Sequence, residues 1–412
     1  MFVARYVLLT LISISFVLFG FITDSPSGII AGLYRIMVES GVLITDYIAV
    51  GGMGAAFVNA GLLMLVSLLI MFVFKVDITG VTIAAVFLMG SFGLFGKNLL
   101  NIWPILLGVY LYSRLRREPF RNLIHVALLA TSIAPIVTEL LFFMGLPLWL
   151  GIILSMAVGV SIGLIITPLS ANVLKIHNGF NLYNIGFSVG ILGTVYVSVF
   201  KSYGYATYSK LVWSTGNDFS SGVFLVSLFI AFAAVGILIN RKAIKRLGSL
   251  FAFTGNPGSD FYEKEDFATL LVNMGINGLL ALGYVLLVGG NLNGPTIGGI
   301  LTVSGFGAFG KHARNILPIF LGVYIGSVTK MWNVNDPSIL LAALFGTALA
   351  PIAGHYGWFW GVVAGFINSS VVLNSGILHG GMNLYNTGFS AGIVAAVMVP
   401  LLNAFRKKEP EN

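Results

Sequence analysis

The stretch FGLFGKNLLNIWPILLGVY at residues 92–110 returns as FGAFGKHARNILPIFLGVY at residues 306–324. Both belong to longer segments, 57–111 and 271–325, which align at an offset of 214 without a gap and are identical at 21 of 55 positions. A second block, HNGFNLYNIGFSVGI at 177–191, returns as HGGMNLYNTGFSAGI at 379–393, at an offset of 202. The blocks keep their order, so the chain is an internal duplication. We place its halves at 1–214 and 215–412.

The composition indicates a protein embedded in lipid. Of 412 residues, 57% are apolar and 9% are charged, and the mean hydropathy is +0.96. Soluble domains carry about 25% charged residues, so this chain could not cover a surface that faces water. The pattern of apolar runs predicts an all-α polytopic protein with about 10–14 spans, some of them broken or re-entrant. The net charge of +8 is confined to short clusters, and we expect no nucleic-acid partner.

The basic clusters predict the orientation. They are Arg114 to Arg121, Arg241 to Arg246 and Arg406 to Lys408, joined by Arg5 and Lys264. Cytoplasmic loops are enriched in Lys and Arg, so we expect both termini in the cytoplasm. We expect the protein in the plasma membrane or the inner membrane of the cell. About seven spans per half, an odd number, then invert the second half. Inverted repeats are typical of secondary transporters, whose substrate site lies at the repeat interface.

The first repeated motif is G-x-F-G-K-x-x-x-N, which contains Lys97 and Asn101 in one half and Lys311 and Asn315 in the other. Its glycines, and a proline seven residues after each lysine, predict a broken helix with a cation at the break. Broken helices in membranes present backbone dipoles to ions and polar solutes. Together with Arg314, the lysines favour an anion. The alternative is that each lysine only anchors its helix at the interface.

The second motif is H-x-G-x-N-L-Y-N-x-G-F-S, and its polar residues are expected to line a site or path. They are His177, Asn181, Tyr183, Asn184 and Ser188, with His379, Asn383, Tyr385, Asn386 and Ser390. In lipid, each unsatisfied polar group costs several kcal/mol, so these groups bond across the repeats, cap helices or meet water. The alternative is that the asparagines and serines cap helices and the tyrosines form an interfacial belt.

Titratable residues within the spans are candidates for ion coupling. Glu139 and its approximate mate His355 differ in kind, and His177 and His379 complete the set. Glu139 could instead pair with a cation near a span end. Arg35 and Glu39, four residues apart, predict a local ion pair.

We expect no cofactor and no metal site. The sequence has no cysteine, its histidines are dispersed, and no P-loop, G-x-S-x-G or H-E-x-x-H motif occurs.

The GLFGKN…P…GVY and NLYNxGFS blocks resemble a prokaryotic tandem-repeat membrane family of unknown function, over nearly the whole chain. A weaker resemblance is to urea channels. Gly93-Leu94-Phe95-Gly96-Lys97-Asn98 is similar to their G-L-Y-G-Y-N segment, and Phe180-Asn181 sits where they have a Pro-Phe-Asn turn. A lysine replaces an aromatic residue in the first, and the second half lacks a clear proline turn, so the resemblance implies an architecture and no substrate.

These features predict a transporter or channel for a small polar or anionic solute, with the site between the repeats. Its partners would be a small molecule or ion, the lipid bilayer and, in a homo-oligomer, further copies of the chain. Two alternatives remain: an embedded enzyme acting on a lipid or isoprenoid, with His177 or His379 as a base, and a structural membrane subunit.

Overall fold

The computed structural model describes residues 2–256 and 260–405, and every regular element in these ranges is helical. The first half contains α1 Phe2–Thr23, α2 Pro26–Val38, α3 Tyr47–Gly51, α4 Met53–Val73, α5 Gly80–Gly93, α6 Trp103–Arg116, α7 Phe120–Ala130, α8 Pro135–Thr138, α9 Leu148–His177 and α10 Asn184–Ser202. The second half contains α11 Asp218–Ile239, α12 Ala243–Leu250, α13 Phe261–Lys264, α14 Phe267–Leu287, α15 Gly294–Gly305, α16 Ala313–Val328, α17 Pro337–Gly346, α18 Ala350–Tyr356, α19 Trp358–Leu378 and α20 Asn386–Phe405.

Nine helices in the described ranges are long and apolar enough to cross a membrane, which confirms a polytopic all-α protein. A tenth span forms if the bent pair Phe120–Ile133 and Pro135–Phe143, which meet at 51°, counts as one. The helix α5 has 14 residues and α15 has 12. At 1.5 Å per residue α5 extends about 21 Å, short of the roughly 30 Å hydrocarbon core. These helices therefore end inside the molecule.

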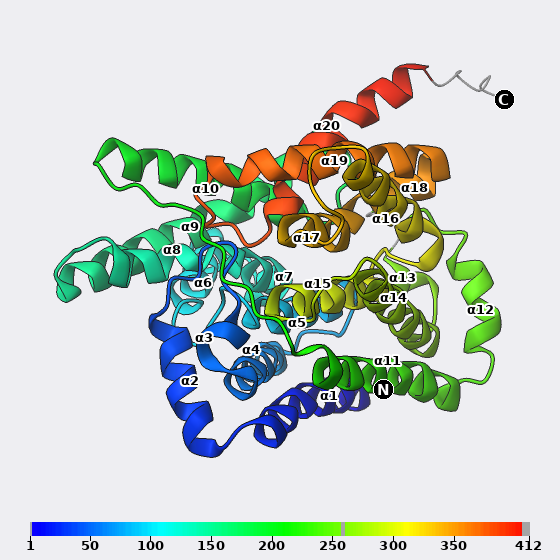
Figure 1. Cartoon of the computed structure of the whole chain (residues 1–412), viewed down its shortest axis with the longest axis horizontal. Coiled ribbons are helices and arrows are strands. Elements are labelled where there is room, and N and C mark those ends of the chain that lie inside the picture. The colour runs from blue at the N-terminus through cyan, green and yellow to red at the C-terminus, as the bar shows by residue number, and fades with distance from the viewer. Residues whose placement is uncertain (1, 257–259, 406–412) are drawn as a thin grey trace.

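The equivalent helices α5 and α15 pack against each other in opposite directions. The Ser91 hydroxyl donates to the Gly298 carbonyl at 2.6 Å and lies 2.9 Å from the Thr302 hydroxyl. Toward one end Gly80 meets the backbone of Ala308, and toward the other Leu94 meets Gly294. Because the partner number falls as the residue number rises, the two helices are antiparallel, as inverted repeats require. Figure 1 shows α2 and α12 at opposite ends of the molecule, in keeping with this inversion.

The helices α10 and α20 begin side by side at the interface of the repeats. Small residues permit this close approach: a Cβ on Gly190 would lie 2.3 Å from the Phe389 ring, and one on Gly392 would lie 2.3 Å from the Phe187 ring. Figure 1 shows the helices diverging from this point. The ends of the two NLYN segments are thereby held together at the centre of the molecule.

Basic residues gather at one end of the bundle, here called the basic face. Arg5 lies 4.9 Å from the Tyr262 ring, Arg246 pairs with Asp266 at 2.7 Å, and Lys75 and Arg121 line one hollow. The predicted cluster Arg406 to Lys408 lies outside the described residues.

The opposite face carries a short segment, residues 209–214, here called the strap. Lys210 and Val212 exchange backbone hydrogen bonds with Leu43 and Ile44, at 2.5–3.2 Å. The Lys210 ammonium pairs with Glu39 at 2.5 Å. The predicted local pair of Arg35 with Glu39 is therefore wrong. Arg35 instead donates to backbone carbonyls at the end of α3, because the strap brings a second cation to Glu39 from 171 residues away.

Two aspartates tie each repeat to the other. Asp46 accepts from the backbone N–H of Gly294 at 3.0 Å, at the start of α15. Asp260 accepts from the backbone of Gly80 and Val81, at the start of α5. Burial raises the pKa of Asp260 to about 7, and the charge of Glu263 adds to the shift. Each carboxylate lies at a helix N-terminus, where backbone donors have no partner within the helix.

Candidate functional site

Lys97 and Lys311 lie in the breaks that follow α5 and α15, and both are fully buried. Asparagines of α4 and α14 fix these breaks. The Asn59 amide donates to the carbonyls of Gly93 at 2.7 Å and Lys97 at 2.9 Å, and Asn273 does the same for Gly307 and Lys311, both at 2.8 Å. The carbonyls at the end of a helix lack partners within it, so these amides satisfy groups that the break leaves free.

Asn101 and Asn315, both predicted site residues, support the same breaks. Each side-chain amide donates to the carbonyl of the motif's second glycine at 2.9 Å, Gly96 in one half and Gly310 in the other. Asn101 also donates to the Thr138 hydroxyl at 3.0 Å. These bonds make the two asparagines supports for the lysine backbones. Arg314, in contrast, lies exposed at the start of α16.

The NLYN segments cross between the repeats. The Asn181 amide donates to the Gly388 carbonyl at 2.9 Å, and Asn383 donates to Gly186 at 3.2 Å. The backbone N–H of Leu182 donates to Ala348 at 3.0 Å, and that of Leu384 to Ser132 at 2.9 Å. Each segment therefore inserts into the broken helix of the opposite half.

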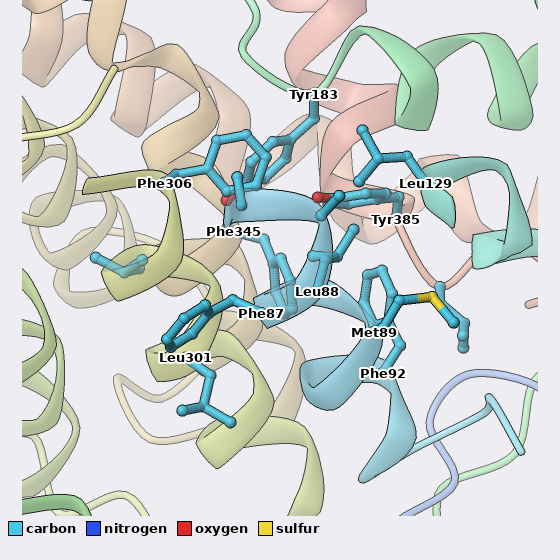
Figure 2. Close-up of a cluster of buried hydrophobic side chains, with 14 of the residues drawn as sticks. Phe87, Leu88, Met89, Phe92, Leu129, Tyr183, Leu301, Phe306, Phe345 and Tyr385 are labelled. Carbon is cyan, nitrogen blue, oxygen red and sulfur yellow. The ribbon is translucent and has the colours of Figure 1, made fainter. Parts of the chain in front are cut away.

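Tyr183 and Tyr385 meet where these segments cross. Their ring centroids lie 4.6 Å apart, and both side chains are buried. Figure 2 shows the two rings side by side above α5, with Phe306 and Phe345 around them. An aromatic cluster thus occupies the repeat interface.

Lys311 reaches the tyrosine of the opposite half. Its ammonium donates to the Tyr183 hydroxyl at 2.5 Å and to the Thr347 hydroxyl at 2.7 Å. It also lies 4.6 Å from the Tyr183 ring and 5.0 Å from the Phe306 ring. Aromatic faces attract cations, so the charge is held by hydroxyls and rings.

Lys97 has the equivalent position but weaker partners. Its ammonium donates to the Leu128 carbonyl at 3.3 Å and to the Met89 sulfur at 3.4 Å, and lies 5.1 Å from the Phe92 ring. The equivalent tyrosine, Tyr385, forms an edge contact with Phe92 at 4.9 Å. Its buried hydroxyl has no hydrogen-bond partner.

Neither buried lysine pairs with a carboxylate. The ion pairs found among residues 2–256 and 260–405 are Lys210 with Glu39 and Arg246 with Asp266, both at the ends of the bundle. Burying a charge without a counterion is costly, and charges at membrane depth tend to serve function. The centre of the protein is thus short of negative charge.

The other predicted residues lie around this centre. His177 and Asn184 hydrogen-bond each other at 3.0 Å, as do His379 and Asn386. Asn184 and Asn386 also donate to backbone carbonyls of α9 and α19, at 3.0 and 2.9 Å.

Glu139 and His355 occupy different surroundings. Glu139 is buried and accepts a hydrogen bond from Ser40. His355 is exposed and packs on Phe180, with ring centroids 5.4 Å apart. The structure therefore does not bring these coupling candidates into one cluster.

A cavity of about 470 Å³ reaches the tyrosine pair from the basic face. Glu118, His125 and Val81 lie along it, and Asn181, Tyr183 and Tyr385 line its inner part. We call it the basic-face cavity.

A second cavity, of about 340 Å³, lies under the strap. Its walls include Lys210, Leu341, Leu384 and Phe345, and the Phe345 ring lies 6.4 Å from that of Tyr183 and 6.2 Å from that of Tyr385. We call it the strap-side cavity.

The two cavities are equivalent in the duplicated sequence. Lining residues match at the offsets of 216 and 202: Leu129 with Phe345, His125 with Leu341, Ala171 with Leu373, Leu182 with Leu384 and Asn184 with Asn386. Since the repeats are inverted, the cavities approach the tyrosine pair from opposite faces.

Sequence reasoning missed several members of the centre. Thr131 and Thr347 lie at the breaks that follow α7 and α17. They match each other at an offset of 216, but nothing else in the sequence distinguishes them from other threonines in helices. Phe92 and Phe306 were visible in the repeated FG motif. Met89 had no signal, because its mate is Val303.

Both halves match one family model, described as a protein of unknown function (DUF1576), at residues 25–202 and 239–404. The chain therefore belongs to this family. The two matches confirm the predicted resemblance to a tandem-repeat family of unknown function. No curated protein and no solved structure matches the chain, so the resemblance to urea channels gains no support.

Proposed function

We propose that this protein moves a small polar or anionic solute across the membrane, through the interface of its two repeats. The observation that carries the proposal is the pair of buried lysines without carboxylate partners, Lys97 and Lys311, beside the tyrosines where the NLYN segments cross. A solute with negative charge would supply the counter-charge that the protein omits.

The cavities supply the path. The solute would enter the basic-face cavity, pass Asn181 and the tyrosine pair, and leave under the strap. Cytoplasmic loops are enriched in Lys and Arg, so we place the basic face in the cytoplasm of a plasma or inner membrane. Most walls of both cavities are apolar, with a few polar side chains such as Asn181 and Tyr183 in one and Asn386 in the other, as in sites that fix one part of a small ligand.

Proteoliposomes test this function. Vesicles containing the purified protein would be placed in isosmotic ammonium salts of formate, acetate, lactate and nitrate, and swelling would be followed by light scattering. Ammonia crosses the bilayer unaided, and a protonophore carries in the proton that balances the charge of the anion, so swelling beyond that of empty vesicles reports entry of the anion through the protein. We expect at least one anion to enter faster than into empty vesicles, and Lys311→Met to abolish the difference.

Lys330→Met is the matched control. Lys330 also has several hydrogen bonds, to Ser369, Ser370 and the Phe366 carbonyl. Unlike Lys311, it is partly exposed, and its aromatic contacts are with Phe366 and Trp332 instead of the tyrosine pair. Entry equal to that of empty vesicles for all four anions, and for urea and glycerol in the same assay, would reject transport of a small polar or anionic solute.

A further inference from the structure

The two equivalent lysine centres are in different states. In one, Lys311, Tyr183 and Thr347 are joined by hydrogen bonds of 2.5 and 2.7 Å. In the other, the same three positions are Lys97, Tyr385 and Thr131, and the bonds are not made. There the tyrosine hydroxyl is buried without a partner.

In the Lys97 centre, a methionine takes the place of the tyrosine hydroxyl as a partner of the lysine. The Met89 sulfur accepts from Lys97 at 3.4 Å and lies 3.4 Å from the Thr131 hydroxyl, which donates its proton to the Leu128 carbonyl at 2.6 Å. A thioether is a weak acceptor, so it is a poor substitute for a tyrosine hydroxyl beside an ammonium group. In the second half Val303 stands at this position, and nothing competes with the tyrosine.

The cavities show the same inequality. The basic-face cavity reaches both tyrosines. The strap-side cavity is bounded at Phe345, whose ring lies 6.2 Å from that of Tyr385, and residues Ser209, Lys210 and Leu211 of the strap cover its outer end. The basic-face cavity thus reaches the tyrosine pair, whereas the equivalent strap-side cavity stops short of it at Phe345.

From this asymmetry we infer that the protein is an alternating-access carrier and not a channel. Making the Lys97–Tyr385 bond while breaking the Lys311–Tyr183 bond is the switch that opens the strap-side cavity and closes the basic-face cavity. In inverted repeats, exchanging the conformations of the two halves converts one open side into the other, because the halves are equivalent and oppositely directed. The inference rests on the proposed transport function and adds its mechanism.

The inference predicts opposite effects for two near-identical substitutions. Tyr183→Phe removes the bond that holds the present state, so the population shifts toward the exchanged state. Tyr385→Phe removes only the bond of the exchanged state, so the present state gains. Each shift should be about tenfold in the ratio of states, the effect of losing one hydrogen bond to a charged group. Met89→Val, which makes the first half resemble the second, should act like Tyr183→Phe.

Cysteine accessibility measures the two states without a solute. The chain has no cysteine, so Ala171→Cys reports on the basic-face cavity and its mate Leu373→Cys on the strap-side cavity. A membrane-impermeant maleimide would be applied to either face of proteoliposomes of sorted orientation, with each reporter alone and combined with each aromatic variant.

The expected result is a reciprocal change. With Tyr183→Phe, labelling at position 171 falls and labelling at position 373 rises about tenfold, the effect of one charged hydrogen bond; with Tyr385→Phe, labelling at 373 falls. If both variants change both positions in the same direction, or neither changes, the switch is refuted. Anion entry that persists together with unchanged labelling would identify a channel, whereas reciprocal labelling without entry of any tested solute would reject only the proposed substrate class.

Discussion

Replacing Lys311 by methionine distinguishes a lysine that binds the solute from a lysine that only anchors its helix. The side chains have similar length and apolar stems, but methionine carries no charge. Lys311 is fully buried, and its ammonium has two hydroxyl partners and two aromatic rings around it. After the substitution Thr347 still donates to the Leu344 carbonyl at 2.6 Å, so one of the two hydroxyls stays satisfied.

The expected effects on folding and on transport differ in size. Replacing a buried charged group with an apolar one of similar volume is often neutral or stabilising, so we expect little change in folded yield. A solute anion about 4 Å from the ammonium would lose about 4 kcal/mol of attraction at an effective dielectric constant of 20, roughly a thousandfold in affinity. Solvent and ions that reach the cavity would lower this figure.

The assay pairs anion-driven vesicle swelling with folded yield from fluorescence-detected size exclusion. Lys97→Met should behave like Lys311→Met, and Lys330→Met like the unaltered protein. The reasoning is refuted if Lys311→Met lowers yield and entry in the same proportion, because the lysine would then serve the fold alone. It is also refuted if all three variants lose entry equally.

Three further predictions follow from single contacts. Asn59→Leu should lower the apparent melting temperature in detergent and the free energy of unfolding by about 2–4 kcal/mol, because two buried carbonyls lose their donor; an unchanged melting temperature would contradict the capping role. Gly190→Leu should separate α10 from α20, since its Cβ would meet the Phe389 ring at 2.3 Å, and a protease-resistance profile equal to that of the unaltered protein would oppose this. Asp260 has a pKa raised to about 7, so the folded state binds its proton more tightly than the unfolded state and stability falls as pH rises from about 4 to about 7. Asp260→Asn should flatten that part of the melting-temperature profile, and an identical slope in the variant would refute the assignment.

The sequence predicted the repeated parts of the molecule best. Polar residues that recur at fixed offsets identified the breaks at Lys97 and Lys311, because two copies under one geometry keep the same hydrogen bonds. For the NLYN segments they left three roles open, and bonding across the repeats was one of them. The structure places several of the predicted residues at the centre. Their roles in binding a solute stay predictions. The orientation of the termini also stays a prediction.

The sequence could not predict partners that the fold brings together from far apart. Lys311 and Tyr183 are 128 residues apart and belong to different halves, and no spacing rule connects them. The same limit produced the wrong pairing of Arg35 with Glu39, since helical spacing favoured a neighbour while the strap supplied Lys210. Hydropathy alone also does not distinguish a full span from a short apolar helix such as α5 or α15, which ends inside the bundle.

The differences between the halves explain why one state is seen. Two identical inverted repeats would have two conformations related by a two-fold rotation and equal in energy, so any preference must come from positions where the copies diverge. The copies diverge at Met89 against Val303 and at Leu129 against Phe345, near the tyrosine pair, and at the strap, which lies over the outer end of one cavity. The Met89 sulfur accepts a hydrogen bond from Lys97. Phe345 separates the strap-side cavity from Tyr385. The strap forms hydrogen bonds with the segment 39–46. All three favour the state in which the basic-face cavity, and not the strap-side cavity, reaches the tyrosine pair. A few kcal/mol from such contacts keeps the minor state at the per cent level, within reach of a solute that binds the two states unequally.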